Sequence, residues 1–367
     1  MLTAFSLVMA VHGLLHLLGF AKAFGMASLP QLTVFISRPM GLLWLVAALA
    51  LLSAAVALHA APRWWWAMGA VALLLSQVSI ASSWADAQFG TLANVLVLAG
   101  VVLGALATGP WSLKAEYERE VERGLARTQA QPPVTEADLV ALPMQVQRYL
   151  RRVGVLGQPR VQSLRVGLTG RMRGGPDQPW MKVDAEQHSF FGPNVRLFFM
   201  TAQMKGVPVV GLHRYVGAQA SMRIKVLSAF SMVDASGEPF TATETVTLFN
   251  DMCVLAPATL IDPSIRWQVL DAQRVIATWT NAGHTISATL IFNADGEMVN
   301  FHSDDRPSIS ADFKSFVPMR WSTPLGPYHP YGPFHLAASA EVRYQAPAGE
   351  YAYGQFELIE VVYNPSP

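Results

Sequence analysis

A near absence of charge in the first third of the chain is the strongest constraint on its fold. Residues 1–112 carry only four charged side chains, Lys22, Arg38, Arg63 and Asp86, although the 367-residue chain contains 26 basic and 25 acidic residues. All the other charged residues lie beyond residue 112. Two parts of one chain that differ so strongly in charge are suited to two different solvents, lipid and water.

Four apolar segments in this region are each long enough to cross a bilayer, which takes about 20 mostly apolar residues. They cover residues 3–21, 40–60, 65–84 and 91–108. Tryptophans fall at several of the predicted ends, where an indole ring fits the headgroup layer. No basic residue precedes the first segment, so we interpret it as a permanent helix rather than a signal peptide. Residues 1–110 are therefore predicted to form a four-helix transmembrane domain.

The distribution of basic residues predicts the orientation of these helices. Lys22 and Arg38 lie between the first two segments, whereas the opposite side carries Arg63 and four basic residues between 114 and 127. Glutamates are interleaved with those later basic residues and reduce the asymmetry. The positive-inside rule favours a cytoplasmic location for both termini, and with them for the C-terminal domain.

Two histidines, His12 and His16, stand at i and i+4 on one face of the first segment, and ionisable residues at membrane depth are candidates for function. Haem ligation would need a second helix with a histidine at matching depth, but His59, the other histidine of this region, lies near a membrane boundary. We therefore predict no cofactor and no metal here, and expect hydrogen bonds to neighbouring helices. The third segment offers the candidate partners Ser76, Gln77 and Ser79.

A charged helical stretch separates the apolar region from the rest of the chain. Between Leu113 and Gln129, glutamates and arginines recur at helical spacing, and Pro132 and Pro133 end the pattern. We interpret residues 111–133 as a charged helical stalk and linker, solvated on all sides. A composition change at this point makes residues 134–367 a separate, water-soluble domain.

The hydrophobic period changes from 3.6 to 2 in this last domain, which is the primary sign of strands. Ile286, Ala288, Leu290 and Phe292 are one example, and about ten such segments follow residue 164. One interruption, Glu244 to Leu255, has apolar residues at helical spacing. We predict an α+β domain dominated by a large curled antiparallel β-sheet with a mid-domain helix, a fold in which a ligand cavity can form.

Several functional classes lack support in the sequence. The near-neutral charge balance provides no basic surface for nucleic acid. Cys253, the single cysteine, excludes an intramolecular disulfide and a cysteine-based zinc cluster. No nucleophile elbow, metalloprotease helix, phosphate-binding loop or nicotinamide fingerprint occurs. Any catalytic residues are therefore unknown from the sequence.

Two sets of polar residues are candidates for a ligand site. Asp305 and Arg306 belong to the densest polar cluster, which runs from His302 to Arg306. If the protein is an enzyme, its catalytic residues are expected in this cluster. Alternatively, Asp304 or Asp305 could simply pair with Arg306. The second set could line a mouth for an anionic headgroup above an apolar cavity. Its members are Arg214, Tyr215, Arg320, Trp321 and Tyr328. Ordinary packing between strands is the alternative interpretation of these aromatic residues.

The chain resembles an uncharacterised family of bacterial multi-pass membrane proteins, a domain of unknown function. The run from His12 to Gly25 (HGLLHLLGFAKAFG) carries this resemblance, together with Arg148-Tyr149-Leu150, Asn250-Asp251-Met252-Cys253 and Asp304-Asp305-Arg306. The resemblance implies the bacterial cytoplasmic membrane as the location. By strand count and mid-domain helix alone, the soluble part also resembles the half-barrels that carry bacterial lipoproteins across the periplasm. That likeness implies the outside of the cytoplasm, against the basic-residue count.

Three functional classes follow from these observations. The first is a membrane-tethered binding protein whose partners are membrane lipids and an apolar or amphiphilic ligand. The second is a membrane enzyme that uses the 302–306 cluster, and the third is a structural or interaction protein. The absence of a catalytic signature favours binding over catalysis.

Overall fold

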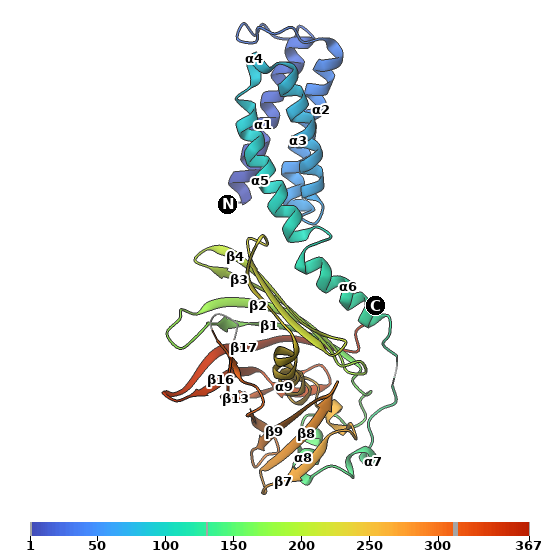
Figure 1. The fold of residues 1–367 in the computed structure, drawn as a ribbon. Helices are drawn as coiled ribbons and strands as arrows, with labels where there is room; N and C mark the ends of the chain where they lie inside the picture. Colours follow the sequence, from blue (N-terminus) through green and yellow to red (C-terminus); the bar gives the residue numbers. More distant parts are fainter. Residues whose placement is uncertain (1, 130, 311–314, 367) are drawn as a thin grey trace. The chain divides into compact units, whose positions relative to one another are not determined.

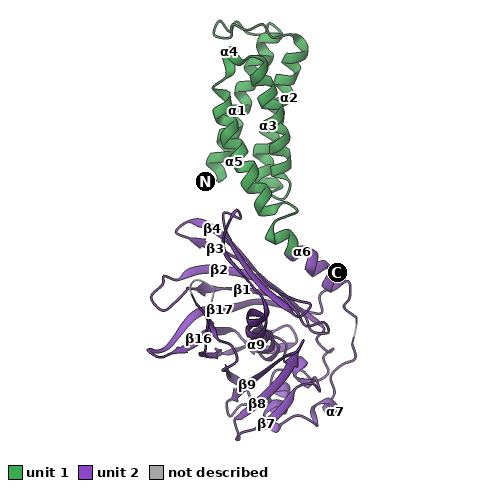
Figure 2. Ribbon diagram, in the orientation of Figure 1, with its two compact units in different colours: residues 1–116 green, residues 117–367 purple. Residues whose placement is uncertain are grey.

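The computed structural model describes residues 2–129, 131–310 and 315–366, and the chain divides into two compact units between Glu116 and Tyr117 (Figures 1 and 2). The first unit is helical. Its elements are α1 (Leu2–Ala23), α2 (Arg38–Ala60), α3 (Trp65–Ser82), the short α4 (Trp84–Ala87) and α5 (Gly90–Thr108). Four helical stretches, α1, α2, α3 and the one that begins with α5, are long and apolar enough to cross a membrane.

Small residues bring the helices of the first unit close together. Helix α1 packs on α2, α2 on α3, and α3 on α5, and α5 also contacts α1. Gly19 of α1 faces the ring of Trp44 on α2, and a Cβ at position 19 would lie 2.3 Å from that ring. Close approach through glycine is typical of helices that associate in an apolar solvent, where packing replaces the hydrophobic effect.

Helix α6 (Leu113–Leu125) begins in the first unit and ends in the second. Beyond Glu116 it has one apolar side, on which Tyr117 and Val121 are buried. Gly124 lies so close to Phe190 of the sheet that a Cβ there would be 2.2 Å from the ring. The charged stretch expected to be solvated on all sides therefore has a buried side along this part of its length.

The second unit is built around one antiparallel sheet of 13 strands in the order β6-β5-β4-β3-β2-β1-β17-β16-β13-β10-β9-β8-β7. Its strands are β1 (Ser163–Met172), β2 (Met181–Phe190), β3 (Val195–Met204), β4 (Val207–Val216), β5 (Gln219–Val226), β6 (Phe230–Ser236), β7 (Arg266–Val269), β8 (Arg274–Asn281), β9 (His284–Phe292), β10 (Met298–Ser303), β13 (Arg320–Ser322), β16 (Ser339–Ala346) and β17 (Gly349–Tyr363). The last strand pairs with the first and so joins the two halves of the sheet. The antiparallel sheet predicted from alternation is confirmed, with short strands such as β7 and β13 added.

Smaller elements complete this unit. Two hairpins lie outside the main sheet, β11 (Ser308–Ile309) with β12 (Phe316–Val317) and β14 (Tyr328–Tyr331) with β15 (Phe334–Ala337). The helices are α7 (Glu136–Leu139), α8 (Met144–Arg152), α9 (Glu238–Leu255) and the 3₁₀ turn η1 (Pro257–Ile261).

The mid-domain helix α9 lies inside the curl of the sheet (Figure 1). It packs against β5, β6, β9, β10 and β15, and its side chains are buried nearly all round. The sequence predicted this helix over 244–255, but it begins at Glu238. Pro239 sits in its first turn, where a proline is tolerated because the missing N–H would have no partner there, and the preceding Gly237 has a φ of 100°.

The curl is tight enough to bring distant strands together. Phe198 of β3 and Phe356 of β17 have ring centroids 6.5 Å apart, although three strand spacings separate them in the sheet order. In a flat sheet that separation would be about 14 Å. We call the face on which these two rings lie the concave face.

Candidate functional site

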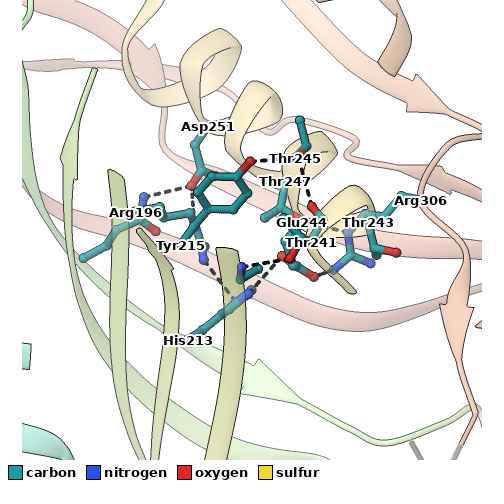
Figure 3. Close-up of polar contacts among 12 residues, drawn as sticks. Arg196, His213, Tyr215, Thr241, Thr243, Glu244, Thr245, Thr247, Asp251 and Arg306 are labelled. Atoms are coloured by element: carbon teal, nitrogen blue, oxygen red, sulfur yellow. Dashed lines mark hydrogen bonds and ion pairs between the residues drawn. The ribbon is translucent and has the colours of Figure 1, made fainter. Parts of the chain in front are cut away.

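A buried network of charged side chains lies between α9 and the concave face of the sheet (Figure 3). Glu244 and Asp251, two turns apart on α9, are 3% and 9% exposed. Burying a carboxylate is costly unless it is paired and hydrogen-bonded. The sheet supplies the required partners from strands that are distant in the sequence.

Asp251 is held by two side chains of the sheet. Arg196 on β3 donates from Nε to Asp251 Oδ2 at 2.5 Å, and Gln187 on β2 donates to the same oxygen at 2.8 Å. The Arg196 guanidinium also lies over the ring of Phe198, 5.1 Å from its centroid. These contacts fix one end of α9 against strands β2 and β3.

Glu244 lies between a histidine and an arginine. His213 Nε2 of β4 is 3.1 Å from Glu244 Oε2, and Arg306 Nη2 is 3.1 Å from Glu244 Oε1. Burial raises the pKa of the Glu244 carboxyl, but His213, Arg306 and Arg196 lower it by more, so the net pKa is well below the ordinary value. Glu244 is therefore charged in the folded protein.

Arg306 reaches this site from the segment after β10. Its Nε donates to Thr247 of α9 at 2.8 Å, and its Nη1 donates to the hydroxyl of Tyr344. The guanidinium lies over the ring of Trp321, 4.8 Å from the centroid, where a cation is favoured by the ring's negative face. Trp321 in turn donates from Nε1 to the Tyr353 hydroxyl at 2.9 Å.

The threonine hydroxyls along α9 form hydrogen bonds within the helix and to the sheet. Thr241, Thr243 and Thr245 each donate to the carbonyl oxygen four residues earlier. The Thr245 hydroxyl also meets Tyr215 Oη of β4 at 3.0 Å, and Asn281 of β8 donates to the same Tyr215 oxygen. A helix so fully bonded to both halves of the sheet holds the curl in one shape.

Beyond this network, the concave face is apolar. The register of strands β1 to β5 and β17 places Leu168, Met172, Met200, Ile224 and Phe356 on it, and each is only half-buried. We call this region the distal concave face. Gly211 of β4 leaves space there for Met200, because a Cβ at position 211 would lie 2.6 Å from its methyl carbon. The Phe198–Phe356 pair marks the border between the charged network and this apolar region.

The structure brings together some of the residues singled out in the sequence and separates others. Tyr215, Arg306 and Trp321 all belong to the buried surroundings of α9. Arg214 lies on the opposite face of β4, where its Nη2 donates to Glu120 of α6 at 3.0 Å. The Tyr328 hydroxyl donates to the Met298 carbonyl at 2.8 Å.

The polar cluster at 302–306 disperses to different partners. Asp304 forms a two-point ion pair with Arg320, with both distances 2.9 Å. Asp305 Oδ2 accepts from the Ser287 backbone N–H at 2.7 Å, and His302 contacts Asn300. Arg306 points to Glu244 instead. Among the described residues, no group of three or more histidine, cysteine or acidic side chains is arranged to hold a metal ion.

The helical unit has a polar network of its own, and among the residues that form it there is no aspartate, glutamate, lysine or arginine. His12 Nε2 lies 2.9 Å from Asn94 Oδ1 of α5 and 3.2 Å from Ser76 Oγ of α3. Asn94 donates from Nδ2 to Gln77 at 2.9 Å, and so links His12 to Gln77. His16 Nδ1 bonds to the His12 carbonyl one turn earlier at 2.9 Å.

Sequence reasoning missed Glu244, Asp251, Arg196 and His213 as members of a site. One signal was available, because two acids seven residues apart in an otherwise apolar and threonine-rich helix predict buried partners. Their partners could not be found in the same way. Arg196 and His213 lie on strands β3 and β4, and nothing in the sequence of either strand marks these residues as partners of an acid on α9.

Comparisons with known proteins give a family match and some solved structures of low similarity. No curated protein matches the chain. A LolA superfamily protein from Nitrosomonas europaea is 10% identical over 61% of this chain and 93% of its own, with a TM-score of 0.36. A DUF1329 family protein from Desulfovibrio piger is 10% identical over 55% and 86%, with a TM-score of 0.34. At these scores neither likeness establishes a shared function.

The family match covers most of the sheet unit. Residues 132–356 match a family of unknown function (DUF6544), and they make up more than half of the chain. The resemblance to an uncharacterised family that the sequence suggested is confirmed at this level. The chain is a member of the family of unknown function DUF6544.

Proposed function

We propose that this protein is a membrane-tethered binding protein for an amphiphile, whose apolar part lies on the distal concave face of the sheet. The observation that carries the proposal is a half-buried apolar surface made by six strands on the inside of a curl. Contiguous apolar surface is rarely left in water without an interaction partner. A concave apolar surface with polar groups at its border is the usual form of a ligand site.

The chemistry of the distal concave face favours a lipid-like molecule over a protein segment. Phe198 and Phe356 meet edge to face, with ring centroids 6.5 Å apart, and close this surface at its border with the charged network. A flexible hydrocarbon chain can follow the apolar side chains beyond that contact without leaving a polar group unpaired. A protein segment would bring backbone N–H and C=O groups onto the same apolar surface, and each of these needs a hydrogen-bond partner.

The charged network supports the same proposal because it holds the concave face rigid. Asp251 pairs with Arg196 of β3 and accepts a hydrogen bond from Gln187 of β2. Glu244 lies 3.1 Å from His213 of β4. A buried charge is costly to separate from such partners. The curl is thus held open in the absence of ligand. A preformed surface loses less conformational entropy on binding.

The helical unit provides the tether in this proposal. Four helices long and apolar enough to cross a bilayer precede the sheet unit. The resemblance to bacterial multi-pass membrane proteins implies the cytoplasmic membrane, and the basic residues favour cytoplasmic termini. With both termini on the cytoplasmic side, reporter fusions after Pro30 and after Pro367 are expected to give opposite signals. Identical signals would contradict four spans.

The binding proposal is tested by mass spectrometry of lipids extracted from the purified full chain. We expect an amphiphile in roughly equal amount to the protein, reduced severalfold in the variant Met200→Gln on the distal concave face. Met232→Gln is the matched control, because Met232 of β6 is 50% exposed and lies off the concave face. Its neighbour Val233 is the residue that pairs with Ile224 and shares that face. Equal lipid in both variants would mean that the amphiphile coats the helices only. A second protein chain in place of a lipid would also refute the proposal.

A further inference from the structure

We propose a second binding site, for a phosphate group, in the pocket between α6 and the ends of strands β2 to β4. The pocket has a volume of about 280 Å³ and is lined by residues of the sheet unit alone. Its charged lining consists of Arg123 of α6, Arg127 in the turn that follows α6, Arg214 of β4, and one carboxylate, Glu120. Arginines in excess over acids in a concave site are suited to a phosphate, which their N–H groups can contact in pairs.

Glu120 forms ion pairs with two of the three arginines. Arg214 and Arg123 both donate to Glu120 Oε1, at 3.0 and 3.2 Å. Arg127 has no ion-pair partner among the residues that the structure describes, and Arg214 Nε is buried without an acceptor there. One carboxylate is shared by two guanidinium groups, so donors remain for an anion.

The floor of the pocket is apolar and fixed. Gly124 sits directly above the Phe190 ring, and Val195 and Val216 complete the wall. Tyr117 anchors the start of this part of α6 by donating to Glu186 Oε1 at 2.9 Å and contacting His188 Nδ1 at 2.7 Å. Helix α6 therefore positions Arg123 relative to Arg214, and the Arg127 N–H donates to the Gly124 carbonyl at 3.1 Å, which ties the following turn to the end of the helix.

Two sources of phosphate fit this chemistry. The first is the headgroup of an anionic phospholipid, since only residues 109–112 separate α6 from the apolar helix α5 in the sequence. This source rests on the proposed membrane insertion. A soluble phosphate monoester is the other source, and it does not depend on a membrane. The site lies on the face of β4 opposite to the concave face, so either ligand would be separate from the proposed amphiphile.

Calorimetric titration of the full chain in a neutral detergent at low salt tests the site. The probes are inorganic phosphate, glycerol 3-phosphate, dihexanoyl phosphatidate and zwitterionic dihexanoyl phosphatidylcholine. We expect the anionic probes to bind and phosphatidylcholine to bind much more weakly. Phosphatidate at least tenfold tighter than glycerol phosphate would identify a lipid, and equal affinities would identify a soluble phosphate compound. Failure of every anionic probe to bind would overturn the proposal.

Four variants test the site, and three of them separate it from a general effect of charge. Arg127→Gln should weaken the binding of anionic probes about tenfold, the cost of losing a charged hydrogen-bond partner. Arg266→Gln, an exposed position on β7 with the same change of charge, should have no effect. Glu120→Gln should tighten binding, because it frees Arg123 and Arg214, and a misfolded protein could not show such a gain. Equal affinity for the anionic probes in Arg127→Gln and the wild-type chain would overturn the proposal. Met200→Gln should bind these probes as the wild-type chain does, even if the test of the amphiphile site gives a negative result.

Discussion

The two units of this protein bury polar groups in opposite ways. In the helical unit the polar network joins His12, Ser76, Asn94 and Gln77, which carry amide, hydroxyl or imidazole groups and no carboxylate or guanidinium. In the sheet unit the buried network consists of full ion pairs between Arg196 and Asp251 and between Arg306 and Glu244.

This difference follows from the solvent that each unit is suited to. A helix that enters lipid must leave water with all its side chains, and a charge there costs several kcal/mol even with a partner. A domain that folds in water can keep a carboxylate solvated until arginines close around it. The comparison predicts that the sheet network is the more costly one to break.

Removal of one partner from the charged network should have the largest effect. Glu244→Gln leaves Arg306 buried without its carboxylate, which typically costs about 3–5 kcal/mol of unfolding free energy. Urea unfolding of the full chain in detergent, followed by near-ultraviolet circular dichroism, measures this loss. Glu238→Gln, an exposed acid on the same helix, should change stability by no more than about 0.5 kcal/mol. Similar losses of unfolding free energy in the two variants would mean that the buried network contributes no more to stability than an exposed acid does.

A truncation should have the next largest effect. A chain of residues 117–367 keeps the buried side of α6, whereas a chain of residues 134–367 loses Tyr117 and Val121 from the sheet. Burial of two such side chains is worth about 3 kcal/mol, so the shorter chain should unfold at a lower urea concentration. Both should be soluble without detergent. Aggregation of both would mean that the sheet unit does not fold in water by itself.

Disruption of the neutral network should have a smaller effect. Asn94→Leu removes the link between His12 and Gln77, and hydrogen bonds between membrane helices are worth about 0.6–2 kcal/mol. Thermal unfolding of the detergent-solubilised chain measures the change, with exposed Val95→Leu as the control. A loss as large as that of Glu244→Gln would erase the distinction between the two networks.

Acidification should have the smallest effect, and should act on α6. Burial lowers the pKa of the His188 imidazole below its ordinary value of 6.5, the effect of Glu186 in raising it being smaller. The unfolded chain therefore binds the proton more readily, so the stabilisation from neutral His188 is present above pH 6.5 and is lost as the pH falls below it. Hydrogen exchange of the α6 amides should accelerate over that range in the wild-type chain and not in His188→Gln. A rate that is independent of pH after correction for intrinsic exchange would contradict this account.

Much of the fold could be predicted from the sequence because the signals were local. Apolar runs defined α1, α2, α3 and α5, and alternation defined strands such as β9. The helix α9 was also visible, although Pro239 obscured its start. A curled sheet was predicted, but the contacts that make it depend on residues distant in the sequence and could not be. Examples are the pairing of β17 with β1 and the contact of Phe356 with Phe198.

The same reason explains the partial prediction of the site. Arg306 and Trp321 were both singled out in the sequence. In the structure the Arg306 guanidinium lies over the Trp321 ring. Asp304 and Asp305 were close to Arg306 in sequence, yet Arg306 pairs with Glu244 on α9. Sequence proximity predicted the wrong carboxylate because the curl places the helix nearer to the guanidinium.

Site-specific photo-crosslinking in living cells tests most directly whether the distal concave face holds an amphiphile. A diazirine-bearing residue would replace Met200 in one variant and Met232 in another, and the crosslinked peptides would be identified by mass spectrometry. The account predicts an amphiphile adduct at position 200 and none above background at position 232. Equal lipid adducts at both positions, or a protein adduct at position 200, would contradict it.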